Sequence, residues 1–175
     1  MVTHQDMVDV YGAENLVTLS REEADELRLH PDDAEVLVTI GLPRSGSRFF
    51  TTEVVGGPEF LTVIDLTKRD GSPHREVILG GPPGDPEMRY SVSAYERFIM
   101  LVQLERTPPR GEVVNDNLCK LIEFVYRFDR CWESGDPAEL EGLTKTLTDL
   151  DPFSFEQPDD WWSIALHQAA GGGIL

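Results

Sequence analysis

The sequence lacks any run of about 18 or more apolar residues, so no segment is long enough to cross a bilayer as a helix. Residues 1–12, MVTHQDMVDVYG, lack the basic start and the apolar stretch of a secretory signal. We therefore expect a cytoplasmic protein that does not bind membranes.

Residues that bind metals or act as nucleophiles are also scarce. There are 2 cysteines and 4 histidines. Cys119 and Cys131 fall in one predicted helix, where they lie about 18 Å apart, too far for a disulfide. The histidines form no H-x-x-x-H or H-E-x-x-H pair, and no serine lies in a G-x-S-x-G elbow. We expect no metal, no cofactor and no catalytic residue.

Basic residues are few, with 15 Lys and Arg against 32 Asp and Glu, a net charge of −17. Residues 1–40 carry 10 acidic and 2 basic side chains, residues 41–110 carry 9 of each, and residues 111–175 carry 13 and 4. Such acidic ends repel nucleic acid and attract a basic partner. The other interpretation is that the charge serves only solubility.

A chain of 175 residues, 40% of them hydrophobic, predicts a single domain over residues 1–175. Thr3–Tyr11 predicts a short helix, Leu16–Leu19 a brief strand, and Ser20 with Glu23 a capping box. Pro31 begins a further helix, which Gly41 ends.

The centre of the chain changes to β-rich runs separated by turn residues, which predict an antiparallel meander because short turns cannot join parallel strands. After the break TPPRGE, Asn115 is the predicted N-cap of a long helix, and Asp136 begins another helix. A last helix carries Trp161 and Trp162, which suit core packing or an interface. The predicted fold is α+β, with helices around a sheet of five to six strands. The predicted strands are 49–55, 60–66, 75–79, 89–95 and 98–104.

The loop Gly41–Arg48, GLPRSGSR, has the glycine spacing of a phosphate-binding loop and resembles the phosphosulfate loop of sulfotransferases. The lysine of the phosphate-loop pattern is replaced by Ser47, and a helix precedes the loop where a strand is required. We expect a turn that leads into a strand. A small enzyme or binding protein that uses this loop on a phosphorylated or sulfated ligand is the alternative interpretation.

Acidic residues in predicted exposed positions are the candidates for partner contact. They lie at two predicted helix starts, where carboxylates also favour the helix dipole, and in the loop GGPPGDPE. The candidates are Asp32, Asp33, Asp85, Glu87, Asp159 and Asp160.

The order of short motifs carries a resemblance that covers roughly residues 8–170. A helix ends in Gly41–Pro43, the aromatic pair Phe49–Phe50 follows, the strand end Ile78–Gly80 comes next, and Val114–Leu118 begins a helix. This order resembles the fourth branch of the SUKH superfamily of bacterial immunity proteins. Leu79 is inserted in the strand end, Asn117 replaces a common serine, and the segment EGLTKTLTDLDPF is longer than usual.

The resemblance implies a single α+β domain that binds and neutralises a toxin encoded beside it, without catalysis. Such toxins are often nucleases or nucleic-acid deaminases, whose basic surface would suit an acidic partner. A scaffold that regulates a cellular partner is a further interpretation.

Overall fold

The structure is a computed structural model that describes residues 1–68, 70–105, 110–134 and 136–171. The helices are α1 (His4–Tyr11), η1 (Ala13–Asn15), α2 (Arg21–Glu26), α3 (Pro31–Thr39), α4 (Leu118–Ser134), α5 (Pro137–Leu150), η2 (Pro152–Phe155) and α6 (Trp161–Gly171). The strands are β1 (Leu16–Val17), β2 (Leu42–Pro43), β3 (Val63–Thr67), β4 (Pro73–Gly80), β5 (Met88–Ser93), β6 (Ile99–Gln103) and β7 (Arg110–Asn115).

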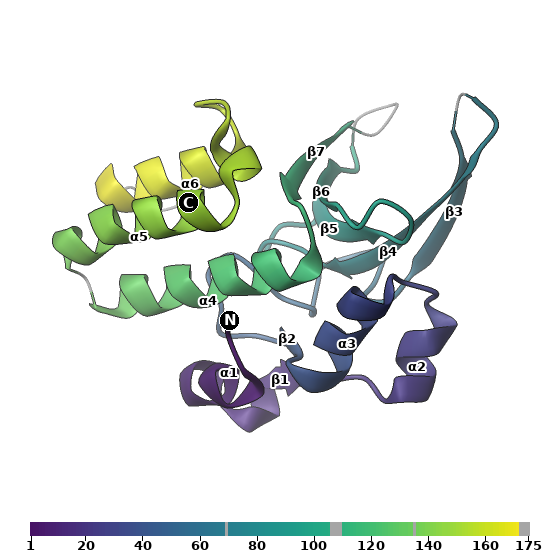
Figure 1. The fold of residues 1–175 in the computed structure, drawn as a ribbon, viewed down its shortest axis with the longest axis horizontal. Coiled ribbons are helices and arrows are strands. Elements are labelled where there is room, and N and C mark those ends of the chain that lie inside the picture. The colour runs from purple at the N-terminus through teal and green to yellow at the C-terminus, as the bar shows by residue number, and fades with distance from the viewer. Residues whose placement is uncertain (69, 106–109, 135, 172–175) are drawn as a thin grey trace.

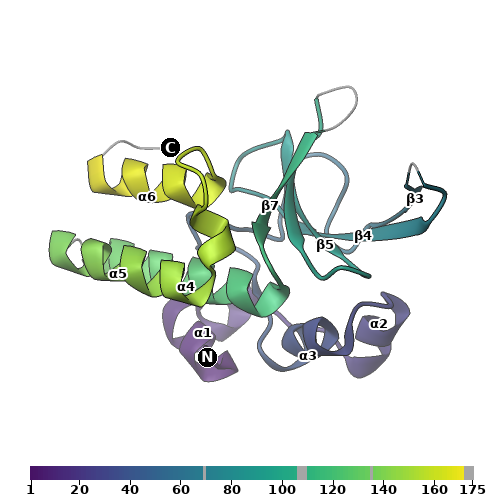
Figure 2. The same cartoon turned by 45° about the horizontal axis from the view of Figure 1, so that its top comes forward.

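Strands β3 to β7 form one antiparallel sheet in chain order, and β1 pairs with β2 separately. The predicted α+β fold and meander are therefore confirmed. Helices α4, α5 and α6 form a layer on one side of the sheet, while α2 and α3 lie below it and α1 lies below α4 (Figures 1 and 2).

Local capping signals explain most helix starts. Thr3 and Ser20 each form a full capping box, and Asp136 accepts a hydrogen bond from the Ala138 amide at 2.9 Å. Gly41 ends α3 with φ +89°, and a Cβ there would lie 2.7 Å from the Val17 carbonyl oxygen. The predicted helix stop is confirmed, because only glycine fits this turn.

The predicted strand over residues 49–55 is wrong, since only Thr51 forms an isolated bridge, to Gly81. The amides of Phe49 and Phe50 both donate to Ser47 Oγ at 3.2 Å, so they are not available to a neighbouring strand. The predicted break TPPRGE is wrong in its second half, because β7 begins at Arg110 as an edge strand paired with β6, while 107–109 lie outside the described residues.

Asn115 is not the N-cap of α4. It lies fully buried at the end of β7, and the side chain of Asn117 instead accepts a hydrogen bond from the Lys120 amide at 3.1 Å. The side chain of Asn115 binds three other groups, Asp151, Ser154 and the indole of Trp162. This residue therefore joins β7 to η2 and α6.

Aromatic side chains fill the core between the sheet and the helical layer. Phe49 lies 4.8 Å from Phe128 between ring centroids, and Phe128 stacks on Trp162 at 5.2 Å. Trp162 is fully buried, whereas its neighbour Trp161 is half-buried. Since Asn115 and Trp162 hold α6 against β7, they fix the position of the segment just before α6.

Candidate partner-binding surface

The two acidic candidates on α3 are engaged within the chain. Asp33 is 1% exposed and accepts hydrogen bonds from Arg97 Nε at 2.9 Å and from the Leu118 amide at 3.3 Å. Asp32 is exposed, and its Oδ2 lies 3.1 Å from Arg97 Nη1. This cluster ties α3 to the β5–β6 turn and to the start of α4, and Arg97 offsets its charge.

The other four acidic candidates lie at one end of the sheet. Glu87 precedes β5, Asp85 lies two residues before it, and Asp159 and Asp160 precede α6. Two acids that the sequence analysis did not select, Glu105 after β6 and Glu112 in β7, lie there too. We call this group the acidic end: Asp85, Glu87, Glu105, Glu112, Asp159 and Asp160.

Strand register brings these residues together. Gln103 on β6 is paired with Met88 on one side and Arg110 on the other, so the three strands end side by side. The Leu104 amide donates to the Glu87 carbonyl oxygen at 2.8 Å. The amide of Trp161 donates to Glu112 Oε1 at 3.1 Å, which attaches the start of α6 to β7.

A buried arginine fixes the loops beside this surface. Arg89 is fully buried, and its guanidinium donates to the carbonyl oxygens of Met88 and Val55, each at 2.7 Å, and of Asp85 at 3.3 Å. Asp85 Oδ1 accepts from the amides of Glu87 and Met88 at 2.7 and 3.0 Å. The loop before β5 therefore has a defined conformation, and Glu87 projects from a rigid turn.

The charges of the acidic end repel one another. The nearby charge of Glu105 raises the pKa of Glu87 above its usual range. Partial burial of the carboxyl group raises the pKa of Glu112, and the charges of Asp160 and Asp159 raise it further. Among the described residues, no ion pair involves any of the six acids, whereas Asp33, Glu123 and Asp151 all have cationic partners. Arg110 offsets this repulsion only in part, by lowering the pKa of Glu112, and perturbed carboxyl groups of this kind are enriched at functional sites.

The loop Gly41–Arg48 uses backbone amides for hydrogen bonds within the chain. Its amides at Arg44 and Arg48 donate to the Asn15 carbonyl oxygen at 2.6 Å and to Asp129 Oδ1 at 3.0 Å. Asp129 is buried, and burial raises the pKa of its carboxyl group. The Arg48 guanidinium lies over the Trp132 ring, 4.8 Å from its centroid. Amides that would hold a phosphate are thus bonded within the chain, beside a carboxylate.

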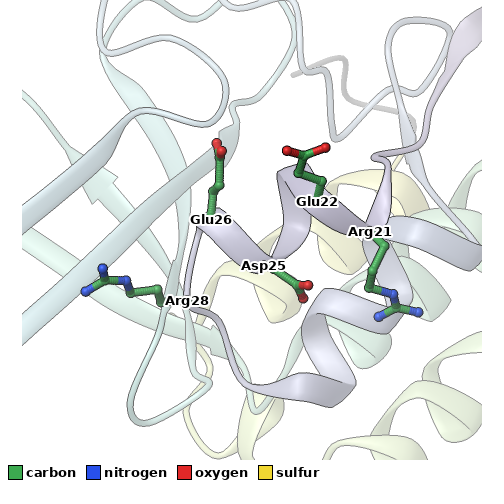
Figure 3. A pocket seen from close by; sticks show the side chains of 5 residues that line it. All are labelled: Arg21, Glu22, Asp25, Glu26 and Arg28. Atoms are coloured by element: carbon green, nitrogen blue, oxygen red, sulfur yellow. The ribbon is translucent and has the colours of Figure 1, made fainter.

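A shallow hollow of about 700 Å³ lies around α2 (Figure 3). Glu22 and Glu26 project side by side from α2 in this view, and Arg21 and Arg28 extend from the two ends of the helix. Arg21 also pairs with Glu35 on α3. Because three acidic and two basic side chains line it, this hollow has no clear preference for a charged partner.

Within the ranges that the structure covers, no three His, Cys, Asp or Glu side chains are grouped as metal ligands. None of the described helices is long and apolar enough to cross a membrane.

Comparison with known protein families gives a match that spans nearly the whole chain. Residues 2–168 match the family described as SUKH-4 immunity protein. No curated protein and no solved structure matches the chain.

Proposed function

Because the chain belongs to the SUKH-4 immunity protein family, we propose that it binds a cognate toxin and blocks it without catalysing a reaction. The family match over residues 2–168 is the observation that carries this proposal. We further propose that the chain acts as a single domain in the cytoplasm. One cluster of buried residues, extending from Val2 to Leu166, supports the single domain.

The toxin in this proposal presents a basic surface, as a nuclease or nucleic-acid deaminase would. A net charge of −17 attracts such a partner at long range and speeds association. We take the acidic end as the surface that contacts the toxin, because its six carboxylates have no cationic partner among the described residues. A basic toxin surface would supply the missing cations and would relieve the repulsion between Glu87 and Glu105. In the complex, the acidic end would cover the groove that otherwise receives nucleic acid.

The alternative, an enzyme or binding protein that uses the loop Gly41–Arg48, has less support. The amides of Arg44, Arg48, Phe49 and Phe50 already have acceptors within the chain. The carboxylate of Asp129 beneath the loop would repel a phosphate or sulfate group.

The test is co-expression with the toxin encoded beside the gene. We expect host growth to be restored, while a control plasmid with a stop codon early in the gene gives no protection. Growth arrest despite abundant soluble protein would contradict an immunity function.

A titration of the purified toxin distinguishes blocking from catalysis. If the chain acts by occupying the toxin, inhibition rises in proportion to the amount added and is complete near one equivalent. Complete inhibition by a small fraction of one equivalent would contradict the non-catalytic proposal.

A further inference from the structure

A hollow at the acidic end is lined by two carboxylates. It measures about 270 Å³ and lies between β6, β7 and the segment before α6. Its lining residues are Leu101, Gln103, Arg110, Gly111, Glu112 and Asp159. Leu101 and Glu112 are paired in register, so they project from the same face of the sheet, and Asp159 closes the hollow from the helical side.

The two carboxylates that line the hollow, those of Glu112 and Asp159, make few interactions with the described residues. Glu112 Oε1 accepts the Trp161 amide, and no hydrogen bond or ion pair among the described residues occupies Asp159. Arg110 is the cation that lines the hollow, and it forms no ion pair with either acid within the described ranges. With Asp160 adjacent, the hollow has an excess of negative charge.

A buried hydroxyl group near the hollow also has no hydrogen-bond partner among the described residues. Tyr90 is paired in register with Leu101 and is 0% exposed, and its hydroxyl oxygen makes no hydrogen bond. Burial raises the pKa of Tyr90, the neighbouring indole of Trp161 lowers it, and the charges of Glu112 and Asp85 raise it further. The indole N–H of Trp161 is buried beside it, also without a hydrogen bond of normal geometry. Buried polar groups of this kind are usually satisfied, so Tyr90 and Trp161 together have hydrogen-bonding capacity that the described residues leave unused.

We propose that this hollow receives an arginine side chain of the toxin, with Glu112 and Asp159 accepting its N–H groups and Tyr90 Oη as a further acceptor at the base. The inference rests on the proposed immunity function and specifies one contact within it. A guanidinium suits the hollow better than an ammonium, because its planar group presents five donors to acceptors on several sides. The arginine methylenes would pack against Leu101, as the stems of long cationic side chains do on apolar surfaces.

The test compares two double variants of the chain with the same change in charge. Glu112→Gln with Asp159→Asn removes both carboxylates but keeps an acceptor for the Trp161 amide. Glu141→Gln with Asp149→Asn, on exposed positions of α5, is the matched control. Calorimetric titration with the purified toxin encoded beside the gene gives the dissociation constant for each.

We expect the first variant to bind about thirtyfold more weakly, the loss typical of a desolvated charge pair, and the control to bind within about twofold of the wild type. The melting midpoint of the first variant should stay the same or rise, because like charges have been removed. The proposal would be overturned if the first variant bound the toxin as tightly as the wild type does. It would also be overturned if both variants lost the same affinity.

Tyr90→Phe provides a second measurement. Its hydroxyl group makes no hydrogen bond to the part of the chain that the structure describes, so the substitution should leave the melting midpoint unchanged or higher while weakening toxin binding about fivefold. Unchanged affinity would contradict the placement of the guanidinium above the phenol. If the wild type itself forms no complex, the proposed function fails. If the wild type binds and the variants bind equally well, only the arginine site fails.

Discussion

Replacement of Asn115 should lower the free energy of unfolding by more than the small size of its side chain suggests. It is fully buried, its Nδ2 donates to Asp151 Oδ2 and Ser154 Oγ at 3.2 Å each, and its Oδ1 accepts from Trp162 Nε1 at 3.1 Å. Asn115→Ala removes three hydrogen bonds, worth about 1 kcal/mol each, and leaves a buried indole N–H without an acceptor. We expect the free energy of unfolding to fall by about 4 kcal/mol in total, measured by urea denaturation with tryptophan fluorescence.

Asn117→Ala is the matched control, because it removes the observed N-cap of α4 on the same short segment. Loss of an N-cap costs about 1 kcal/mol. If Asn117→Ala cost more than Asn115→Ala, the helix would begin at Asn115, as the sequence suggested, and the structural assignment would be refuted. Because Asn115 holds α6 against β7, its replacement should also weaken toxin binding through the position of Asp159.

The remaining predictions concern stability. Arg89→Met should lower the free energy of unfolding by about 2 kcal/mol in chemical denaturation, because it removes the buried donor that joins the carbonyl oxygens of two loops; a loss below about 1 kcal/mol would contradict this. Gly41→Ala should cost about 2 kcal/mol or more, against about 1 kcal/mol for Gly46→Ala, since both have positive φ but only the former meets backbone at 2.7 Å. Equal losses in thermal unfolding would exclude the close contact as the cause. Glu105 raises the folded pKa of Glu87 above its unfolded value, so the folded chain binds more protons and loses stability as pH rises through that range. Glu87→Gln should therefore raise stability at pH 7 but not at pH 4, and lower stability at pH 7 would refute the repulsion.

Features set by neighbouring residues were predictable from the sequence. The capping box at Ser20, the first-turn proline of α3 and the cap at Asp136 each depend on residues within one helical turn. The meander followed from the turn residues between β-rich runs. The order of the short motifs indicated the immunity family.

Features set by distant residues were not predictable. The segment after Ser47 is not a strand, partly because Asp129, 81 residues away, accepts the Arg48 amide. Since β7 was interpreted as a break, Glu112 was not recognised as a neighbour of Asp159. Asp33 was selected as an acid at a helix start, but Arg97, 64 residues away in the sequence, donates a hydrogen bond to it. In each case the signal is a tertiary contact that no local pattern encodes.

The central claim is that this immunity protein binds a basic toxin through its acidic surface. The most direct test is the dissociation constant of the purified complex at about 50 mM and about 500 mM salt, where screening lengths differ about threefold. We predict a complex at low salt that weakens at least about tenfold at high salt, mainly through slower association. A complex whose affinity does not change with salt, or no complex at low salt, would contradict the claim.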